Sequence, residues 1–442
     1  MRRLVGVLAG VVLAAGSLVA VGVTPAGAAT EITVTSNGDS GGSCTPFPTN
    51  CTLRQAFEAA RSGGSAAADD VVIVIRADVG TITLAIELTY DGGDGGGAHE
   101  LTIQGNGATV QGDNTFRLIN YFSGTGLLTI DGLTLTKGNA SFGGAIFSAS
   151  AAVTVSNSTF TDNQAANASG GAIHANAALT VTNSTFTNNR ADSGGAIFAD
   201  SGVTVTNSTF AKNEAGSGGA LFAYGVVTVS NSTISGNTAT VRGGGIFVCP
   251  GGSVVLAYAT VVANSAPEGA NIGSGLCGCS TESTSGGDVS AENCGSPHSQ
   301  ADGATALASD DPLVSFGSVV ALPLGGGQNC AYILDDPVGY NFSDDTSCGF
   351  SAATDKQNAG DPLLGALASN GGPTLTRLPQ AGSPLIDAIP NTACQTAPLA
   401  TGITTDQRGL ARPEQSGGQC DIGAVEVQLP PAAVIVTPKF TG

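Results

Sequence analysis

Two acidic side chains of this sequence could catalyse a reaction if the fold brings them together as a pair. Asp192 and Asp200 lie close enough in the central region to meet across a turn. Cleavage of a glycosidic bond needs two carboxyl groups about 5 Å apart in retaining enzymes and about 6.5–9.5 Å apart in inverting ones. Whether any two acids reach such a spacing depends on the elements that position them.

Other candidate catalytic groups have simpler structural interpretations. His174 has no acid partner near it in the sequence. Arg408 lies in a stretch rich in glycine and proline, and we expect it to form an ion pair with Asp387, Asp406 or Asp421. No Ser-His-Asp, HExxH or phosphate-loop pattern is found. We therefore predict no catalytic residue and no cofactor.

Ten cysteines suggest disulfide bonds, provided that the chain is exported. A metal site is disfavoured, because no Cys-x-x-Cys pair occurs and only one histidine, His298, lies close to a cysteine in sequence. Three expected pairs flank short loops or motifs. The other four cysteines would form two further disulfides, and the sequence does not determine which cysteine pairs with which. The expected pairs are Cys44 with Cys51, Cys330 with Cys348 and Cys394 with Cys420, and the remaining residues are Cys249, Cys277, Cys279 and Cys294.

Two motifs alternate through the middle of the chain. Gly143-Gly144-Ala145-Ile146 has four further copies, and Val-Thr-Val-Ser-Asn-Ser-Thr-Phe or a close variant lies between them. The asparagines of the second motif follow one another in steps of 26, 24 and 24 residues; they are Asn157, Asn183, Asn207 and Asn231. A fixed period of this length is the signature of a repeat architecture.

The alternation of apolar and polar residues in Val-Thr-Val-Thr predicts a strand with one buried face. A unit of about 24 residues cannot bury that face alone, but stacked copies pair strand to strand about 4.8 Å apart. Equivalent residues then form columns. One column consists of asparagines whose amides can hydrogen-bond along the stack: Asn163, Asn189, Asn213, Asn237 and Asn264.

These columns allow the test for paired acids. Asp162, Asn188, Lys212 and Gly236 share one column, and Gln164, Arg190, Glu214 and Thr238 share another. No column of the regular repeats holds carboxylates on neighbouring rungs, although Asp192 and Asp200 could still approach each other. We interpret Arg190 and Glu214 as a surface ion pair between rungs.

One aromatic column is a candidate binding site. If the isoleucine of each Gly-Gly motif points inward, the next residue points outward, and an exposed aromatic stripe would form a binding face. The alternative, which we favour, is that the C-terminal segment covers the stripe or that a bend buries the rings. The stripe consists of Phe147, His174, Phe198, Phe222 and Phe247.

The sequence predicts an all-β, single-stranded right-handed parallel β-helix with an N-terminal helical cap and a disulfide-rich C-terminal region. Leu53, Ala56, Phe57 and Ala60 share one face of the expected helix. The strands 71–75, 81–88, 101–104 and 127–135 would form the early, less regular rungs. The expected parts are a signal peptide (1–29), the cap (30–70), the β-helix (71–265), its cysteine-containing, loop-rich continuation (266–350), the C-terminal region (351–427) and a tail (428–442).

The N-terminal segment predicts export. Arg2 and Arg3 precede the uncharged apolar stretch 4–23, and Ala26-Gly27-Ala28 fits a signal-peptidase site. The alternative is a membrane anchor. We expect a mature chain that starts near Ala29 or Thr30 and contains no membrane span. Its formal net charge, −19 for the whole chain, should repel nucleic acid and anionic membranes.

Several motifs resemble those of known bacterial surface proteins. Gly-Gly-Ala-Ile alternating with Phe-x-x-Asn resembles the repeats of polymorphic outer membrane proteins, and the sequence from Cys51 to Ala56 is similar to the Cys-Ser-Leu-Arg-Glu-Ala domain. Asp406-Gln-Arg-Gly409 and Cys420-Asp-Ile-Gly-Ala424 look like part of a choice-of-anchor region. The resemblance implies a pectin-lyase-like fold and a secreted or cell-surface location, but no activity.

Two functions fit this sequence. The first is a non-catalytic, exported protein that acts by contact, as an adhesin or an envelope-associated structural protein, with an unknown polysaccharide or protein ligand. The alternative is a polysaccharide lyase or glycoside hydrolase. Depolymerisation assays on acidic and neutral polysaccharides would distinguish the two.

Overall fold

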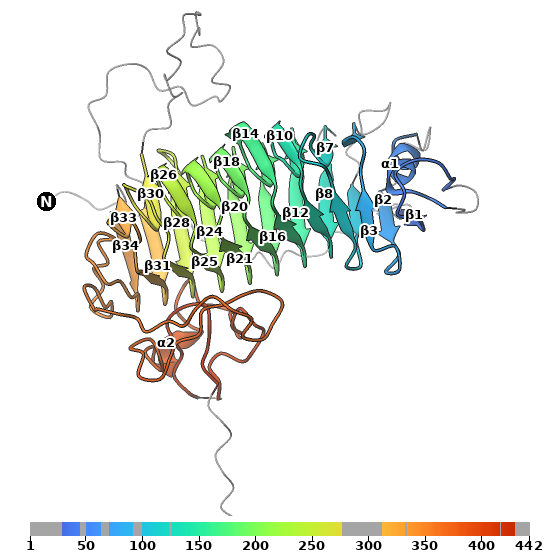
Figure 1. The fold of residues 1–442 in the computed structure, drawn as a ribbon. Helices are drawn as coiled ribbons and strands as arrows, with labels where there is room; N and C mark the ends of the chain where they lie inside the picture. The colour runs from blue at the N-terminus through green and yellow to red at the C-terminus, as the bar shows by residue number, and fades with distance from the viewer. Residues whose placement is uncertain are drawn as a thin grey trace, which may run out of the picture.

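Each turn of the chain contains short strands that pair in parallel with the equivalent strands of the turns before and after it (Figure 1). The structure is a computed structural model, and it describes residues 29–44, 50–62, 70–91, 100–122, 126–275, 312–331, 334–415 and 417–428. The expected signal peptide lies almost entirely outside these residues, as do Cys277, Cys279, Cys294 and most of the tail.

Four strands make up each regular rung, and each strand belongs to a different sheet. We number the sheets in the order in which a rung visits them. The first sheet contains β1 (Thr30–Val34), β2 (Val71–Ile75), β5 (Leu101–Gln104), β8 (Leu127–Asp131), β12 (Ala152–Ser156), β16 (Leu179–Thr182), β20 (Val203–Thr206), β24 (Val226–Ser230), β28 (Ser253–Ala257), β31 (Pro312–Phe316) and β34 (Leu334–Gly339). The second contains β3 (Thr81–Thr83), β6 (Thr109–Gln111), β9 (Thr134–Thr136), β13 (Thr159–Thr161), β17 (Thr185–Thr187), β21 (Thr209–Ala211), β25 (Thr233–Ser235), β29 (Thr260–Val262) and β32 (Val319–Ala321).

The third sheet is the shortest and is confined to the regular repeats. It contains β10 (Asn139–Phe142), β14 (Gln164–Ser169), β18 (Arg190–Ser193), β22 (Glu214–Ser217) and β26 (Thr238–Arg242). The fourth contains β4 (Leu88–Tyr90), β7 (Ile119–Tyr121), β11 (Ile146–Ser148), β15 (Ile173–Ala175), β19 (Ile197–Ala199), β23 (Leu221–Ala223), β27 (Ile246–Val248), β30 (Ile272–Ser274) and β33 (Cys330–Ala331).

The core runs along the inside of this stack. Alternate residues of the first sheet, such as Val181 and Val205, are fully buried. The second sheet contributes Phe160, Phe186 and Phe210, whose rings stack with centroids 4.6 and 4.7 Å apart. Burial of these apolar columns is what holds the stack together, since no single rung can bury its own inner face.

The corners of the rungs need separate hydrogen-bond acceptors, because a turning backbone leaves the strand ladder. At the corner between the first and second sheets, the N–H of Ser158 donates to the hydroxyl of Ser184, and Ser184 and Ser208 repeat the arrangement. At the next corner the predicted asparagine ladder is present. Asn189 donates to Asn213 Oδ1, both from its backbone nitrogen and from Nδ2, at 3.0 Å.

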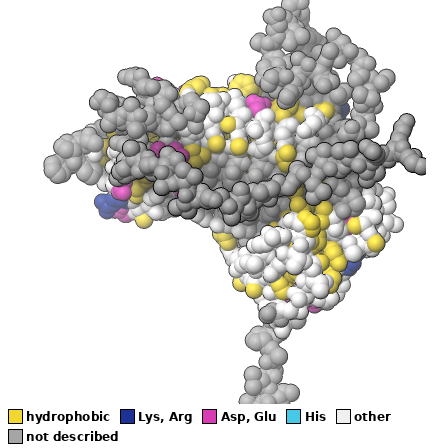
Figure 2. All heavy atoms as spheres, turned by 180° about the vertical axis from the view of Figure 1, so that it is seen from behind, with side chains coloured by type: hydrophobic (Ala, Val, Ile, Leu, Met, Phe, Trp, Pro, Cys, Tyr) yellow, Lys and Arg dark blue, Asp and Glu magenta, His cyan; other side chains and the backbone are white. Residues whose placement is uncertain are grey.

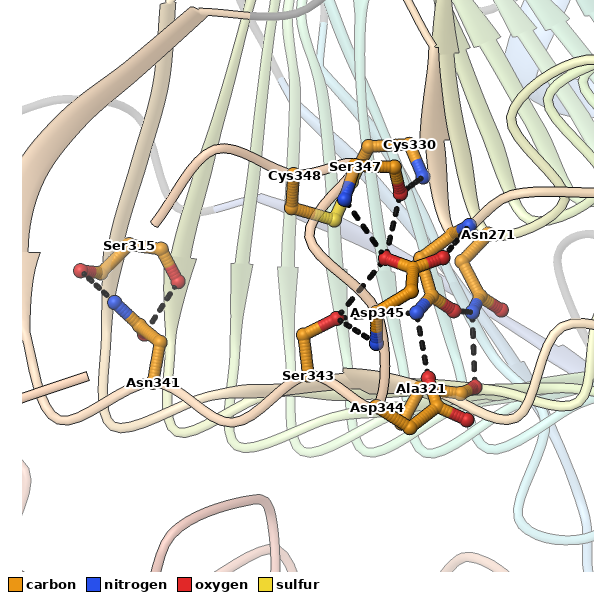
Figure 3. The surroundings of a disulfide bond; sticks show 11 residues. Asn271, Ser315, Ala321, Cys330, Asn341, Ser343, Asp344, Asp345, Ser347 and Cys348 are labelled. Carbon is orange, nitrogen blue, oxygen red and sulfur yellow. Dashed lines mark hydrogen bonds between the residues drawn. A yellow bond between two sulfur atoms is a disulfide. The ribbon is translucent and has the colours of Figure 1, made fainter. Parts of the chain in front are cut away.

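The asparagine ladder continues beyond the regular repeats. It runs through Asn264 and Asn271 to Asn329, whose backbone nitrogen donates to Asp345 Oδ2 at 2.9 Å (Figure 3). Burial opposes ionisation of Asp345, but hydrogen bonds from Asn329 and Ser347 outweigh it and lower the pKa of this carboxyl. The Cys330–Cys348 disulfide lies beside this end of the ladder, as predicted.

The parallel stack differs from the prediction at its start. β1 pairs with β2, so the first sheet begins at Thr30 rather than near residue 71. Helix α1 (Leu53–Ser62) lies between these two strands in the sequence, packs its buried Leu53, Ala56 and Phe57 against the first rungs, and follows the predicted Cys44–Cys51 disulfide.

Two of the strands predicted in the early rungs were predicted too long, and the structure divides each of these ranges between two strands. The range 81–88 contains β3 and the start of β4, and 127–135 contains β8 and most of β9. The reason is the corner between sheets, where Gly132 adopts φ 65° and the chain changes direction.

The C-terminal region packs against the outside of the second sheet (Figure 1). Gln407 donates to Thr209 Oγ1 at 3.0 Å and accepts from Thr233 Oγ1 at 2.6 Å, which links the region to two rungs. The region has its own core and includes the short helix α2 (Asn391–Cys394) and the predicted Cys394–Cys420 disulfide.

Two arginines organise this region. The expected ion pair of Arg408 is formed with Asp406, at 2.8 Å. A second pair, which the sequence did not suggest, joins Arg412 to Glu426 at 3.3 Å with both side chains buried. Burial raises the pKa of Glu426 to about 7, and the neighbouring Arg412 opposes that rise. Within the described part of the chain, no helix is long and apolar enough to cross a membrane.

Candidate binding groove

A polar groove lies where the second sheet turns into the third. Its volume is about 430 Å³. Half of its lining comes from the turns that precede β18, β22 and β26, and half from the first residues of β14, β18, β22 and β26. The lining residues are Asn188, Asn189, Lys212 and Gly236 from the turns, and Gln164, Arg190, Glu214 and Thr238 from the strands.

Strand pairing fixes the spacing along the groove. Gln164 is paired in register with Arg190, Arg190 with Glu214, and Glu214 with Thr238, which confirms the predicted column. Neighbouring strands lie about 4.8 Å apart, so four rungs extend the groove over about 14 Å along the helix axis. All four side chains are exposed. The groove therefore presents a row of polar groups to an elongated ligand.

The predicted ion pair between Arg190 and Glu214 is not formed. Their backbones pair directly, but the two side chains do not approach within ion-pair distance, and neither makes a hydrogen bond. Exposed ion pairs are worth only about 0–1 kcal/mol, so water competes effectively for both groups. Both side chains remain free to contact a ligand.

The aromatic column of the fourth sheet is not the exposed stripe that a binding face would require. His174, Phe198, Phe222 and Phe247 are 2–8% exposed, and only Phe147 is half-buried. His174 and Phe198 stack with centroids 4.8 Å apart, and Phe198 and Phe222 with centroids 4.9 Å apart.

The favoured alternative for this column, that the rings are buried or covered by the C-terminal segment, is correct only in its first part. The rings of Phe198, Phe222 and Phe247 are buried, and they form a separate apolar cluster with Cys249 and the partly buried Tyr224. The described part of the C-terminal segment does not cover them, because it packs on the second sheet. Cys249 is itself disulfide-bonded.

His174 has polar neighbours that the sequence did not reveal. Its Nδ1 is 3.0 Å from Ser169 Oγ, its Nε2 is 2.9 Å from Asn176 Oδ1, and Asp200 Oδ2 lies 4.0 Å from Nε2. Burial lowers the pKa of His174 to about 4, so the ring is neutral at pH 7. Ser169 is only 7% exposed, which is unfavourable for a nucleophile that must reach a substrate. We interpret these contacts as satisfying a histidine that replaces phenylalanine in the stack.

The structure does not bring Asp192 and Asp200 together as a catalytic pair. Asp192 is exposed on β18, whereas Asp200 lies at the corner after β19, beside His174. Burial raises the pKa of Asp200, and no neighbouring carboxylate contributes to that rise. Two close carboxylates would raise each other's pKa. In the described part of the chain, no cluster of three metal-binding side chains occurs either.

The sequence contained the signal for the groove, although it was not recognised there. The two columns that line it are visible in the sequence, but only the folded structure shows that Arg190 and Lys212 within them have no partner among the described residues. By contrast, Gln407 contacts Thr209 across 198 residues, and Arg412 and Glu426 both lie outside the repeat, so no period could reveal these contacts.

Comparison with known proteins supports the fold that these observations describe. Residues 99–294 match the family model described as "Right handed beta helix region". The repeats therefore form a right-handed β-helix. No curated protein and no solved structure matches the chain. The match includes the groove and the aromatic column, but it assigns neither of them an activity.

Proposed function

We propose that this chain is an exported, non-catalytic β-helix protein that acts by contact at or outside the cell surface, as an adhesin or an envelope-associated structural protein. The observation that carries the proposal is the composition of the groove. Its lining holds a single carboxylate, Glu214, beside Arg190 and Lys212. Hydrolysis of a glycosidic bond needs two carboxyl groups, whereas binding needs only complementary polar groups.

Much of the described outer surface is suited to contact rather than to catalysis. Only 11% of the residues are charged, and most of the described surface in Figure 2 is uncharged. Threonines form exposed or partly exposed columns, such as Thr154, Thr180 and Thr204 of the first sheet. Such a surface presents the same chemistry at regular intervals along the stack.

Export is supported by two features of the sequence. The basic and apolar N-terminal segment ends in Ala26-Gly27-Ala28, and the described cysteines are in disulfides, which persist in oxidising compartments. In this proposal α1 acts as the N-terminal cap of an exported β-helix, and the resemblance of the C-terminal part to choice-of-anchor regions supports a location at or outside the cell surface. N-terminal sequencing of the secreted protein should give a start at Ala29 or Thr30.

An activity assay tests the absence of catalysis. The mature protein is incubated with acidic and neutral polysaccharides, with and without calcium, and new reducing ends and unsaturated products are measured. We expect neither. Depolymerisation that disappears in Asp192→Asn, Asp200→Asn or Glu214→Gln would overturn the proposal in favour of a polysaccharide lyase or glycoside hydrolase.

A further inference from the structure

Nearly every described cation of this protein already has a partner. Nine of the twelve described lysine and arginine side chains form an ion pair or a hydrogen bond within the chain. The three exceptions in the described part of the chain are Lys137, Arg190 and Lys212. The chain has a formal net charge of −19, yet these three described cations contact neither a carboxylate nor any other described hydrogen-bond partner.

The three free cations lie at one corner of the β-helix. Lys137 and Lys212 occupy the same column of the turn after the second sheet, and Arg190 begins β18 of the third sheet. Two of the three, Arg190 and Lys212, line the groove together, and Lys137 does not. The groove therefore holds two cations against one carboxylate, although the whole molecule is acidic.

The backbone at Lys212 adopts the left-handed conformation of the corner that it shares with the neighbouring rungs. Lys212 adopts φ 55°, and the equivalent residues on the neighbouring rungs are Asn188 and Gly236, with φ 56° and 73°. Glycine and asparagine enter this left-handed region at little cost, whereas lysine does so at a larger one. Lys137, in the same column, has φ 59° as well, so this conformation belongs to the corner, and what distinguishes Lys212 is that its unpaired side chain lines the groove.

The remaining lining determines the class of ligand. It contains no aliphatic or aromatic side chain, and polar surface predominates, so it is better suited to a polar ligand than to the apolar groups of a peptide or a lipid. Gln164, Asn188 and Thr238 supply donors and acceptors suited to hydroxyl groups. The two cations supply charge-assisted donors for an acid group, and these are stronger than neutral ones. At physiological ionic strength, acids of the protein more than about 8 Å away are screened. Two exposed acids lie nearer, Asp162 one rung from Asn188 and Asp192 two residues from Arg190, and neither lines the groove.

We propose that this groove binds an acidic glycan, with a carboxylate or sulfate held between Arg190 and Lys212 and the sugar hydroxyls bonded to the neighbouring polar side chains. The chain of sugars runs along the helix axis, across the four rungs that form the groove. The inference rests on the proposed contact function and gives it a ligand class.

A binding experiment with charge variants tests the proposal. Fragments of polygalacturonate, alginate, hyaluronate and heparin are titrated into the mature protein by calorimetry, with maltohexaose and cellohexaose as neutral controls. We expect at least one acidic fragment to bind and the neutral ones to bind more weakly. For that fragment, Arg190→Ala and Lys212→Ala should each weaken binding by about tenfold, which corresponds to about 1.4 kcal/mol.

Lys137→Ala is the matched control. It removes an equally exposed and unpaired lysine from the same column, but outside the groove, and it should leave the affinity unchanged. Both lysine variants should keep the wild-type circular dichroism spectrum. The inference is overturned if no acidic fragment binds, or if Lys137→Ala weakens binding as much as Lys212→Ala. Neither result would bear on catalysis, which the depolymerisation assay measures separately.

Discussion

His174 shows what a single substitution in a repeat column costs. Four members of the column are phenylalanine, and an imidazole in the same buried stack must remain uncharged. Burial lowers the pKa of His174 to about 4, against an ordinary value of about 6.5. Between these values the unfolded chain binds a proton that the folded chain does not, so stability falls as the pH falls through this window.

His174→Phe should remove this pH dependence. The integrated contribution of a pKa difference of this size is about 3 kcal/mol, all of it present above pH 6.5 and lost by pH 4. We expect the free energy of unfolding of the wild type to drop by roughly that amount relative to the variant over the window. Urea unfolding of both proteins at several pH values between 4 and 7 measures the difference.

The comparison between variant and wild type is needed because Glu426 titrates in the opposite sense. Its folded pKa of about 7 lies above its ordinary value, so its contribution is present at low pH and is lost as the pH rises towards 7. That contribution is common to both proteins and cancels in the difference. A constant difference between pH 4 and 7 would contradict the burial of a neutral imidazole in this stack.

At the scale of elements, the corners depend on side chains as much as the strands depend on backbone pairing. Asn213 accepts from the backbone nitrogen and Nδ2 of Asn189, and it donates to the carbonyl oxygen of Phe186 at 3.0 Å. All of these groups are buried and have no access to water. Asn213→Ala should therefore lower the free energy of unfolding by about 2–4 kcal/mol, since each buried group left unpaired costs about 1–3 kcal/mol.

Asn188→Gly is the control for this prediction. Asn188 lies at the same corner in the preceding rung and is exposed, and its side chain makes no hydrogen bond within the described structure. Glycine accepts its positive φ, so the expected change in stability is small. Chemical denaturation of both variants measures the contrast. Equal losses would mean that the ladder adds nothing beyond the turn itself.

These corners also show how far the sequence could predict the fold. The asparagine ladder was predictable because its members repeat with the period of the strands. The serine ladder was available from the same period at Ser158, Ser184 and Ser208, but it was not recognised. The early corners at Gly132 and in 81–88 were missed because those rungs share no repeated motif, so nothing in the sequence marks where a strand turns.

The candidate groove was predictable only in part, for a related reason. Register places Arg190 beside Glu214, and the sequence is sufficient for that. Whether two exposed side chains then close into an ion pair depends on rotamers and on competition with water, which differ by less than about 1 kcal/mol. The burial of the aromatic column likewise depends on neighbours such as Tyr224, which come from outside the repeated motifs.

For the whole molecule, the stack should behave as a linear array in which each rung contacts only its neighbours. Residues 179–202 form one complete rung of 24 residues, from the start of β16 to the residue before β20. Its removal should let β12 pair directly with β20 and join Asn163 to Asn213 in the ladder. The contacts of Gln407 with Thr209 and Thr233 lie outside the deleted segment.

We expect this deletion to leave a folded protein that unfolds in one transition, with a smaller dependence of stability on denaturant because less surface is exposed.

Deletion of residues 179–190 alone should prevent folding. It leaves half a rung, so the following strands cannot reach their own sheets and their inner faces lose their columns. Circular dichroism and urea denaturation of the two deletions measure the contrast. Equivalent behaviour would show that the 24-residue unit is not the element that stacks. The longer deletion also removes Asn188, Asn189 and Arg190 from the groove, so it should weaken the binding of acidic glycans by about tenfold or more while the fold persists.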